Sequence, residues 1–204
     1  MITLEFLVTA FIVVLIPGTG VIFTLSTGIT QGRKASVFAA IGCTVGIVPH
    51  LLATILGLAA LMHTSAVAFQ TLKLAGVAYL FYLALVRWRD KTLFSVEKNP
   101  AARPASTLML KALLLNILNP KLTLFFLAFL PQFVVSGAGS PLLQMMILSS
   151  VFMMMTFFVF VVYGFLAHAF RARVIDSPRV QANLRRGFAL AFAGLGARLA
   201  FSER

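Results

Sequence analysis

Charged side chains are scarce in this sequence. Only 11% of its 204 residues are Asp, Glu, Lys or Arg, while 60% are hydrophobic, and the mean hydropathy is +1.00. Soluble domains carry roughly 25% charged residues. A chain this apolar cannot hide its surface in a water-soluble core, whereas lipid-facing side chains in a bilayer need no such burial. The composition therefore predicts an α-helical protein that crosses a lipid bilayer several times.

Acidic residues are the scarcest charged group, and none of the five lies deep in an apolar stretch. They are Glu5, Asp90, Glu97, Asp176 and Glu203. A transporter of hard metal cations would need carboxylate ligands, so that class is disfavoured. A cationic substrate such as lysine is disfavoured too, because it would lack a buried counter-charge. One chain alone also offers no carboxylate proton relay.

Cysteine and histidine are nearly absent as well. Cys43 is the one cysteine, which excludes an intramolecular disulfide, and its default interpretation is a small buried thiol. An intramembrane enzyme would need a nucleophile–base pair or metal ligands at membrane depth, and the sequence offers neither. That enzyme and a structural membrane subunit are the alternatives to a transporter. We expect no enzymatic activity, no metal and no other cofactor.

Basic residues are plentiful and give a net charge of +12. Such a charge often indicates nucleic-acid binding, but here the basic residues lie between apolar blocks. They occur at Arg33 and Lys34, in the stretch 89–107 and from Arg171 to Arg186, which is every second loop. This alternation follows the positive-inside rule. It predicts cytoplasmic basic loops, both termini outside and no nucleic-acid partner.

Six apolar stretches approach the roughly 20 residues that a membrane span needs. They are residues 4–26, 36–62, 66–86, 108–134, 142–167 and 187–201, of which the last is short and weak. Residues 1–88 and 108–204 each contain three spans, and the basic linker 89–107 joins them. With three spans each, the two groups enter the membrane in opposite orientations. The predicted fold class is an all-α membrane protein of two inverted three-helix repeats.

The first span of each repeat is interrupted near its middle by a proline, Pro17 or Pro120. Proline has no N–H and its ring clashes with the carbonyl four residues back, so the carbonyls of Val13 and Asn116 are freed. Paired broken helices indicate the central site of a secondary transporter. The N–H groups that begin a new helix carry partial positive charge and suit a carboxylate, whereas free carbonyls suit an ammonium. Each proline could instead merely kink a packed helix.

Residues around the two breaks are the candidates for substrate binding. They are Pro17, Gly18, Thr19, Gly20, Asn116, Asn119, Pro120 and Lys121. Lys121 lies roughly 20 Å into its span, where a charge indicates function, although it could also be a structural tether to a freed carbonyl. Asn116 and Asn119 share a helix face and could contact substrate or satisfy the broken backbone.

His50 and Lys73 are candidates for a proton-carrying or cavity-lining role. His50 follows Pro49 and is the only histidine deep in an apolar stretch. The alternatives are a neutral hydrogen-bonded histidine and, for Lys73, a side chain that reaches toward the membrane surface.

Several motifs recur along nearly the whole chain in an order typical of one family. The glycine pattern comprises Pro17-Gly18 and Gly28, Gly32, Gly42 and Gly46. The third span carries Leu72-Lys73, Gly76 and Tyr79-Leu80. The most specific motif is the run from Asn116 to Lys121 followed by the run from Phe125 to Phe133. In these motifs the chain resembles the LysE/RhtB family of amino-acid exporters.

The resemblance implies export of amino acids or close derivatives from the cytoplasm across the bacterial cytoplasmic (inner) membrane, usually driven by the proton gradient. The family typically has Pro-Gly-Pro followed by Asn or Asp in the first span, whereas this chain has Pro17-Gly18-Thr19-Gly20. Thr19 offers only a hydroxyl, so the departure bears on the substrate. We therefore predict a proton-coupled secondary exporter of neutral, zwitterionic amino acids. A homo-oligomer is compatible with this prediction.

Overall fold

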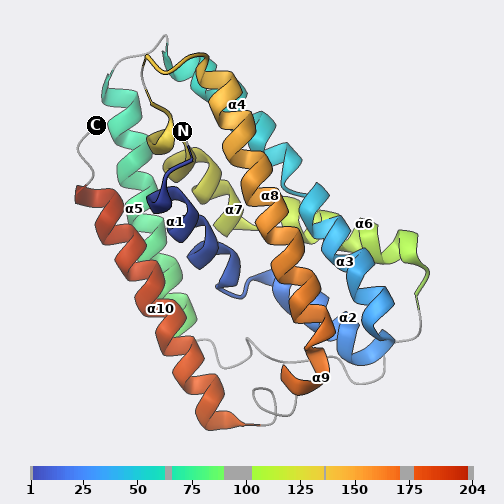
Figure 1. Cartoon of the computed structure of the whole chain (residues 1–204). Helices are drawn as coiled ribbons and strands as arrows, with labels where there is room; N and C mark the ends of the chain where they lie inside the picture. The colour runs from blue at the N-terminus through green and yellow to red at the C-terminus, as the bar shows by residue number, and fades with distance from the viewer. Residues whose placement is uncertain (1, 63–65, 90–102, 136, 171–176, 202–204) are drawn as a thin grey trace.

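The described part of the chain consists of helices joined by short turns, and it contains no strand (Figure 1). The computed structural model describes residues 2–62, 66–89, 103–135, 137–170 and 177–201. The helices are α1 (Leu4–Leu15), α2 (Thr19–Gln31), α3 (Arg33–Val45), α4 (Val48–Met62), α5 (Ala66–Arg89), α6 (Ala105–Ile117), α7 (Pro120–Leu124), the π-helical η1 (Phe125–Phe129), the 3-10 helix η2 (Leu130–Phe133), α8 (Pro141–Phe165), α9 (Ala167–Phe170) and α10 (Pro178–Phe201).

Local sequence explains where several helices begin. The Thr3 hydroxyl accepts a hydrogen bond from the Phe6 N–H at the start of α1. Proline is the first residue of α7 and of α8, a position where its missing N–H costs nothing. Gly32, between α2 and α3, has a φ of 88°, a conformation that glycine adopts without steric cost. The chain can therefore reverse sharply there.

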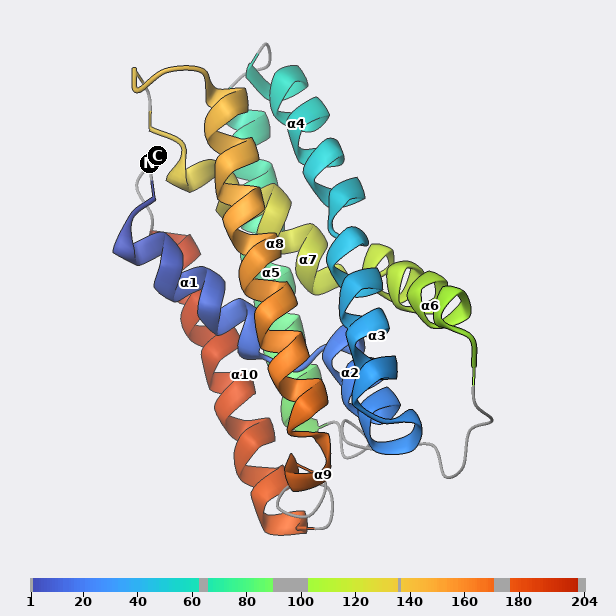
Figure 2. The ribbon, with the colours of Figure 1, turned by 45° about the vertical axis from the view of Figure 1, so that its right-hand side comes forward.

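Two pairs of consecutive helices are bent at the predicted prolines. The axes of α1 and α2 differ by 55°, with Pro17 between them, and the helix from Pro120 to Phe133 leaves α6 at 50°. Figure 2 shows both bends near the middle of the molecule. The missing N–H of each proline and its clash with the preceding turn explain why the helices stop there.

The described helices fit a protein that crosses the membrane more than once. The stretch Arg33–Gly57 and α8 are each long and apolar enough to span a bilayer, and each bent pair passes the same test if it counts as one span. The described residues therefore contain between two and four spans by this criterion. The chain is a multi-pass membrane protein.

Several predicted boundaries differ from the observed ones. The weak last stretch, predicted at 187–201, belongs to the 24-residue helix α10, which begins at Pro178. Hydropathy missed its first turns because they carry three arginines, although arginine is a good helix former. Similarly, α5 continues through Arg89 and α6 begins at Ala105, so helices extend into the predicted linker 89–107. Residues 90–102 of the linker and 171–176 of the last basic loop lie outside the described residues.

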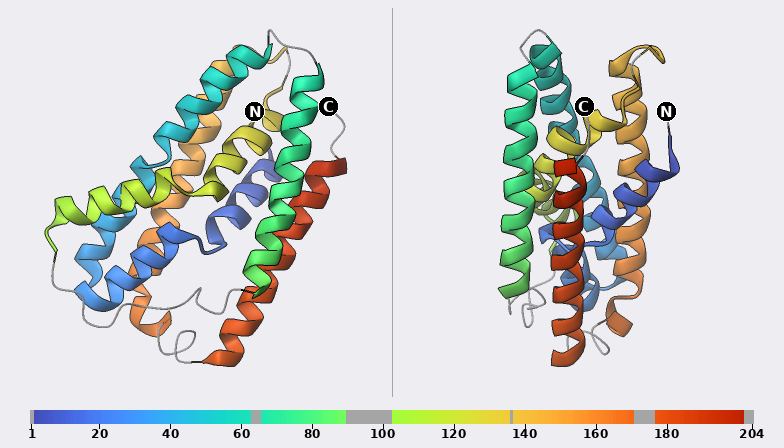
Figure 3. Two further views of the ribbon diagram at one scale, coloured as in Figure 1. Left: turned by 180° about the vertical axis from the view of Figure 1, so that it is seen from behind. Right: turned by 90° about the vertical axis from the view of Figure 1, so that its left-hand side faces the viewer.

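The helices form a central group and a peripheral pair (Figure 3). The antiparallel helices α5 and α10 pack along each other, while α3 packs against α2, α6 and α8. At the end of the molecule where both termini lie, Arg198 of α10 donates hydrogen bonds to the Glu5 carboxylate and the Thr9 hydroxyl of α1. Its guanidinium also lies over the Phe133 ring. These contacts join the peripheral pair to the first bent helix.

Two glycines allow α3 to approach α6 closely. A Cβ atom at Gly42 would lie 2.8 Å from the Ala112 Cβ and as close to the Met109 Cα, and one at Gly46 would lie 2.9 Å from the Asn116 Cβ. Real Cβ atoms do not approach this closely. The close contact between α3 and α6, the helix that ends at the second break, therefore depends on the absence of a side chain at both glycines.

Substituting Gly42→Ala is expected to destabilise the protein by about 1–3 kcal/mol, because the added methyl group overpacks the α3–α6 contact. The unfolding midpoint in detergent, followed by fluorescence size-exclusion chromatography after heating, should fall by roughly 5 °C. Gly57→Ala is the matched control, since nothing lies within 4 Å of a Cβ there. An equal midpoint for both variants would contradict the assigned role of Gly42.

Candidate functional site

The two breaks face each other in the middle of the protein, and Lys121 connects them. Its Nζ donates hydrogen bonds to the carbonyls of Val13, at 2.9 Å, and Ile16, at 2.8 Å. Val13 is the residue four positions before Pro17, whose carbonyl the proline frees. Only 9% of Lys121 is exposed. The ammonium thus sits at the C-terminal end of α1, where the helix dipole concentrates partial negative charge.

The second break has a corresponding arrangement. The Nε2 atom of His50 lies 2.9 Å from the carbonyl of Asn116, the residue four positions before Pro120. Because a carbonyl only accepts hydrogen bonds, Nε2 carries the proton. Nδ1 lies 3.4 Å from the Thr123 hydroxyl, whose proton it accepts when the ring is neutral. At both breaks, the carbonyl four residues before the proline therefore accepts a hydrogen bond from a basic side chain of another helix. The Asn116 carbonyl also accepts a hydrogen bond from the Asn119 backbone N–H, at 3.0 Å.

The two asparagines hold the second break in shape. The Asn116 amide donates to the Cys43 carbonyl at 2.6 Å and its oxygen accepts from the Asn119 amide at 3.3 Å. The Asn119 oxygen accepts from the Lys121 backbone N–H at 3.2 Å, which makes it the N-cap of α7. Both side chains are buried. Asn119 satisfies a backbone N–H at the start of α7, and Asn116 joins the turn to α3, so the two side chains hold the turn from which Lys121 extends.

The first turn of α2 packs directly on this asparagine turn. The Thr19 hydroxyl donates to the carbonyl of Leu115 at 3.2 Å. A Cβ at Gly18 would lie 3.3 Å from the Asn119 Nδ2, and one at Gly20 would lie 2.6 Å from the Asn116 Oδ1. The two glycines therefore let the backbone approach. Because the N-cap Gly18 has no side chain, no side-chain cap covers the N–H groups that begin α2.

Like Thr123, Tyr163 was not predicted to belong to this site. The Tyr163 hydroxyl of α8 donates to the carbonyl of Leu15 at 3.0 Å, so a third carbonyl at the end of α1 has a side-chain donor. Tyr163 lies in a long apolar stretch without a break or a charge. The sequence offered only a weak indication of this contact, namely that the hydroxyl of a buried tyrosine usually finds a hydrogen-bond partner.

The structure brings together most of the predicted residues. Those that meet around the two breaks are Pro17, Gly18, Thr19, Gly20, His50, Asn116, Asn119, Pro120 and Lys121. Lys73 is buried on α5 and is not part of the geometry above. In the described stretches, no group of three or more His, Cys, Asp or Glu side chains is placed to hold a metal ion.

Comparison with known proteins identifies relatives along the whole chain. A family model described as LysE type translocator matches residues 11–203. The chain is 34% identical to a leucine efflux protein of Enterobacter sp. (strain 638), over 96% of this chain and 93% of that protein. It is 31% identical to a homoserine/homoserine lactone efflux protein of Salmonella typhimurium, over 96% and 94% of the two chains.

A third relative is an uncharacterized membrane protein of Vibrio cholerae, which is 32% identical over 98% of this chain and 97% of its own length. No solved structure matches the chain. The residues matched by the family model include both breaks, at Pro17 and Pro120. The chain therefore belongs to the family of LysE type translocators, and it is a membrane transporter rather than an enzyme.

Proposed function

We propose that this protein exports neutral, zwitterionic amino acids or close derivatives across the bacterial cytoplasmic membrane, driven by the proton gradient. The observation that carries the proposal is the contact of the Lys121 ammonium with the Val13 and Ile16 carbonyls, where two broken helices meet. Relatives named as leucine and homoserine efflux proteins support amino acids as the substrate class.

The proposed topology has six spans, formed by α1–α2, α3–α4, α5, α6–η2, α8 and α10. The 24 residues of α10 extend over roughly 36 Å, which is enough to cross a bilayer. The start of α3, the end of α5 and the start of α10 lie at the end of the molecule away from both chain termini (Figure 1), and basic residues occur at each of these helix ends. The positive-inside rule then puts these basic ends in the cytoplasm and both termini outside. Residues 1–88 and 108–204 form the two inverted repeats in this topology.

A zwitterion can replace the contact that Lys121 makes. Its ammonium would take the place of Nζ at the Val13 and Ile16 carbonyls, while its carboxylate would bind the displaced Lys121 ammonium and the N–H groups that begin α2. No net charge enters the site in this exchange. A cationic amino acid would add a positive charge beside Lys121 and is therefore disfavoured.

The same exchange can couple binding to movement. Lys121 belongs to the second proposed repeat, and Val13 and Ile16 belong to the first. The contact therefore joins one repeat to the other. When substrate enters between these groups, the direct contact is replaced by one through the substrate. The two repeats then interact differently with and without substrate. A shift between inward-open and outward-open states requires such a difference.

His50 is the proposed proton carrier. It is 7% exposed, and protonation of Nδ1 would leave the bond from Nε2 to Asn116 intact. The Thr123 hydroxyl can either donate to a neutral ring or accept from a charged one. Uptake and release of this proton would therefore leave the hydrogen bond from His50 to the Asn116 carbonyl in place.

The proposal predicts transport by the purified protein. Liposomes that contain it and are loaded with labelled leucine or homoserine should release the label faster than protein-free liposomes when a pH gradient is imposed. Labelled lysine should leave only at the background rate. If neither neutral amino acid is released above background, and a wider screen of amino acids also gives no release, then the proposed function is wrong.

Lys121→Gln separates the two roles that this lysine could have. Glutamine can still donate a hydrogen bond to the α1 carbonyls but has no charge for a carboxylate. A charged hydrogen bond contributes about 1.5–3 kcal/mol, so export should fall by about 10- to 100-fold while the protein remains folded. Folding is checked by size-exclusion chromatography.

Lys34→Gln is the matched control for this substitution, because it removes the same charge from an exposed position at the start of α3. It should export at the wild-type rate. Lys121→Met, which also removes the donor, should reduce both export and thermal stability. If the folded Lys121→Gln protein exported substrate at the wild-type rate, the role of Lys121 would be that of a structural tether only.

His50→Gln tests the proton pathway, because glutamine can keep a donor near the Asn116 carbonyl but cannot titrate. Exchange of labelled for unlabelled substrate should continue at a rate within about threefold of wild type, while acceleration by a pH gradient should disappear. Thr123→Val is the control, since it leaves the imidazole in place and should preserve the pH dependence. Gradient-driven export that survives in His50→Gln would exclude His50 as the proton carrier.

A further inference from the structure

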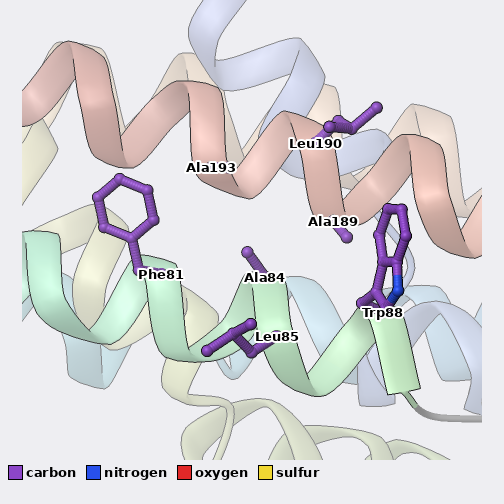
Figure 4. A pocket seen from close by; sticks show the side chains of 7 residues that line it. All are labelled: Phe81, Ala84, Leu85, Trp88, Ala189, Leu190 and Ala193. Carbon is purple, nitrogen blue, oxygen red and sulfur yellow. The ribbon is translucent and has the colours of Figure 1, made fainter.

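An apolar groove runs between α5 and α10 on the peripheral side of the protein. It has a volume of about 260 Å³ and is lined by Phe81, Ala84, Leu85, Trp88, Ala189, Leu190 and Ala193. Figure 4 shows the rings of Phe81 and Trp88 extending from α5 toward α10, with Ala84 between them. The small alanines make the groove, because larger side chains at these positions would fill the space between the helices.

The groove opens toward lipid and lies apart from the two breaks. Four of its large side chains, those of Phe81, Leu85, Trp88 and Leu190, are exposed, with between 43% and 65% of their surface accessible. In a membrane protein, such an apolar exposed surface contacts acyl chains. A hydrocarbon chain can therefore enter the groove without displacing any part of the site around Lys121.

One end of the groove is strongly basic. The Arg186 guanidinium lies over the Trp88 ring, 5.8 Å from its centre. Arg186 precedes Ala189 and Leu190 by three and four positions, so it extends the groove-lining face of α10 by one turn. Arg89, the exposed last residue of α5, follows Trp88. Neither helix contains an acidic residue.

A second guanidinium beside this end is incompletely satisfied. The Nε atom of Arg185 is buried and has no hydrogen-bond partner among the residues that the structure describes. A guanidinium binds a phosphate through two parallel hydrogen bonds. Because the Arg185 Nε atom is inaccessible, a phosphate at this end of the groove would bind instead to Arg186, whose side chain is exposed.

We propose that the groove is a binding site for an anionic phospholipid, with the phosphate at Arg186 and one acyl chain between α5 and α10. Tryptophan concentrates at the level of lipid headgroups, which puts Trp88 at the boundary between phosphate and chain. Basic pockets between membrane helices bind anionic headgroups on the cytoplasmic side. The charge and the apolar lining together match such a lipid better than they match a zwitterionic one.

A second copy of the chain is a poorer match for this face. Two copies in one membrane have the same orientation, so a two-fold axis would bring the same end of the groove against itself. The Arg186 side chains would then approach each other, and neither α5 nor α10 supplies a carboxylate to compensate. Like charges in that position are repulsive. A phospholipid phosphate removes this repulsion.

Trp88 makes the proposal directly testable, because it is the only tryptophan in the chain. The purified protein is reconstituted into bilayers of phosphatidylcholine and phosphatidylglycerol in which one or the other lipid carries brominated acyl chains. Bromine quenches tryptophan fluorescence on contact. The relative association constant at Trp88 should favour phosphatidylglycerol about fivefold, the preference expected from one arginine–anion interaction at a membrane surface.

Arg186→Gln should reduce this preference to about onefold, whereas Lys34→Gln, which removes a charge from the start of α3, should leave it unchanged. Comparing the two lipids within each variant cancels any direct effect of Arg186 on the fluorescence. Three results would overturn the proposal. They are equal quenching by both lipids in the wild type, a preference that persists in Arg186→Gln, and weak quenching by both lipids with a cross-linked dimer through this face.

Discussion

The backbone carbonyls at the two breaks have to be hydrogen-bonded inside the membrane, and the centre of the structure is arranged around this requirement. Lipid offers no donor, so a carbonyl freed by proline at this depth needs one from the protein or from a water-filled cavity. The ammonium of Lys121 donates to carbonyls at the end of α1. At the end of α6, the imidazole of His50 shares the Asn116 carbonyl with the Asn119 backbone N–H. Each donor lies on a helix other than the one whose carbonyl it contacts. A bent helix therefore needs a second helix packed against its break.

The neighbouring side chains follow from that meeting. Asn116 and Asn119 hold the turn that carries Lys121, and glycines in the first turn of α2 let the backbone come close to it. In the proposed function, the ammonium of an amino acid replaces that of Lys121, which has the same charge, on the α1 carbonyls. A site that satisfies itself in this way can exchange its internal ammonium for that of a substrate at little electrostatic cost.

The peripheral pair α5 and α10 forms a surface separate from the two breaks. Its exposed side is apolar along most of its length and basic at one end, so it suits both parts of an anionic lipid. At the other end of α10, Arg198 bonds to Glu5 and Thr9 of α1. The pair is thus connected to the first bent helix, and through it to the Lys121 contact. The proposed lipid site and the proposed substrate site therefore lie on separate surfaces of the protein.

The sequence by itself determined the helical membrane class, the family resemblance and the positions of the two breaks, because hydropathy and proline act locally along the chain. It was less reliable for α10, whose first turns contain three arginines that lower the hydropathy without preventing a helix. Only the tertiary structure decided which donor serves which carbonyl. Lys121 and Val13 are 108 residues apart, and Tyr163 carries no local mark of its bond to Leu15. Such pairings depend on how the bent helices pack, which no single stretch of sequence encodes.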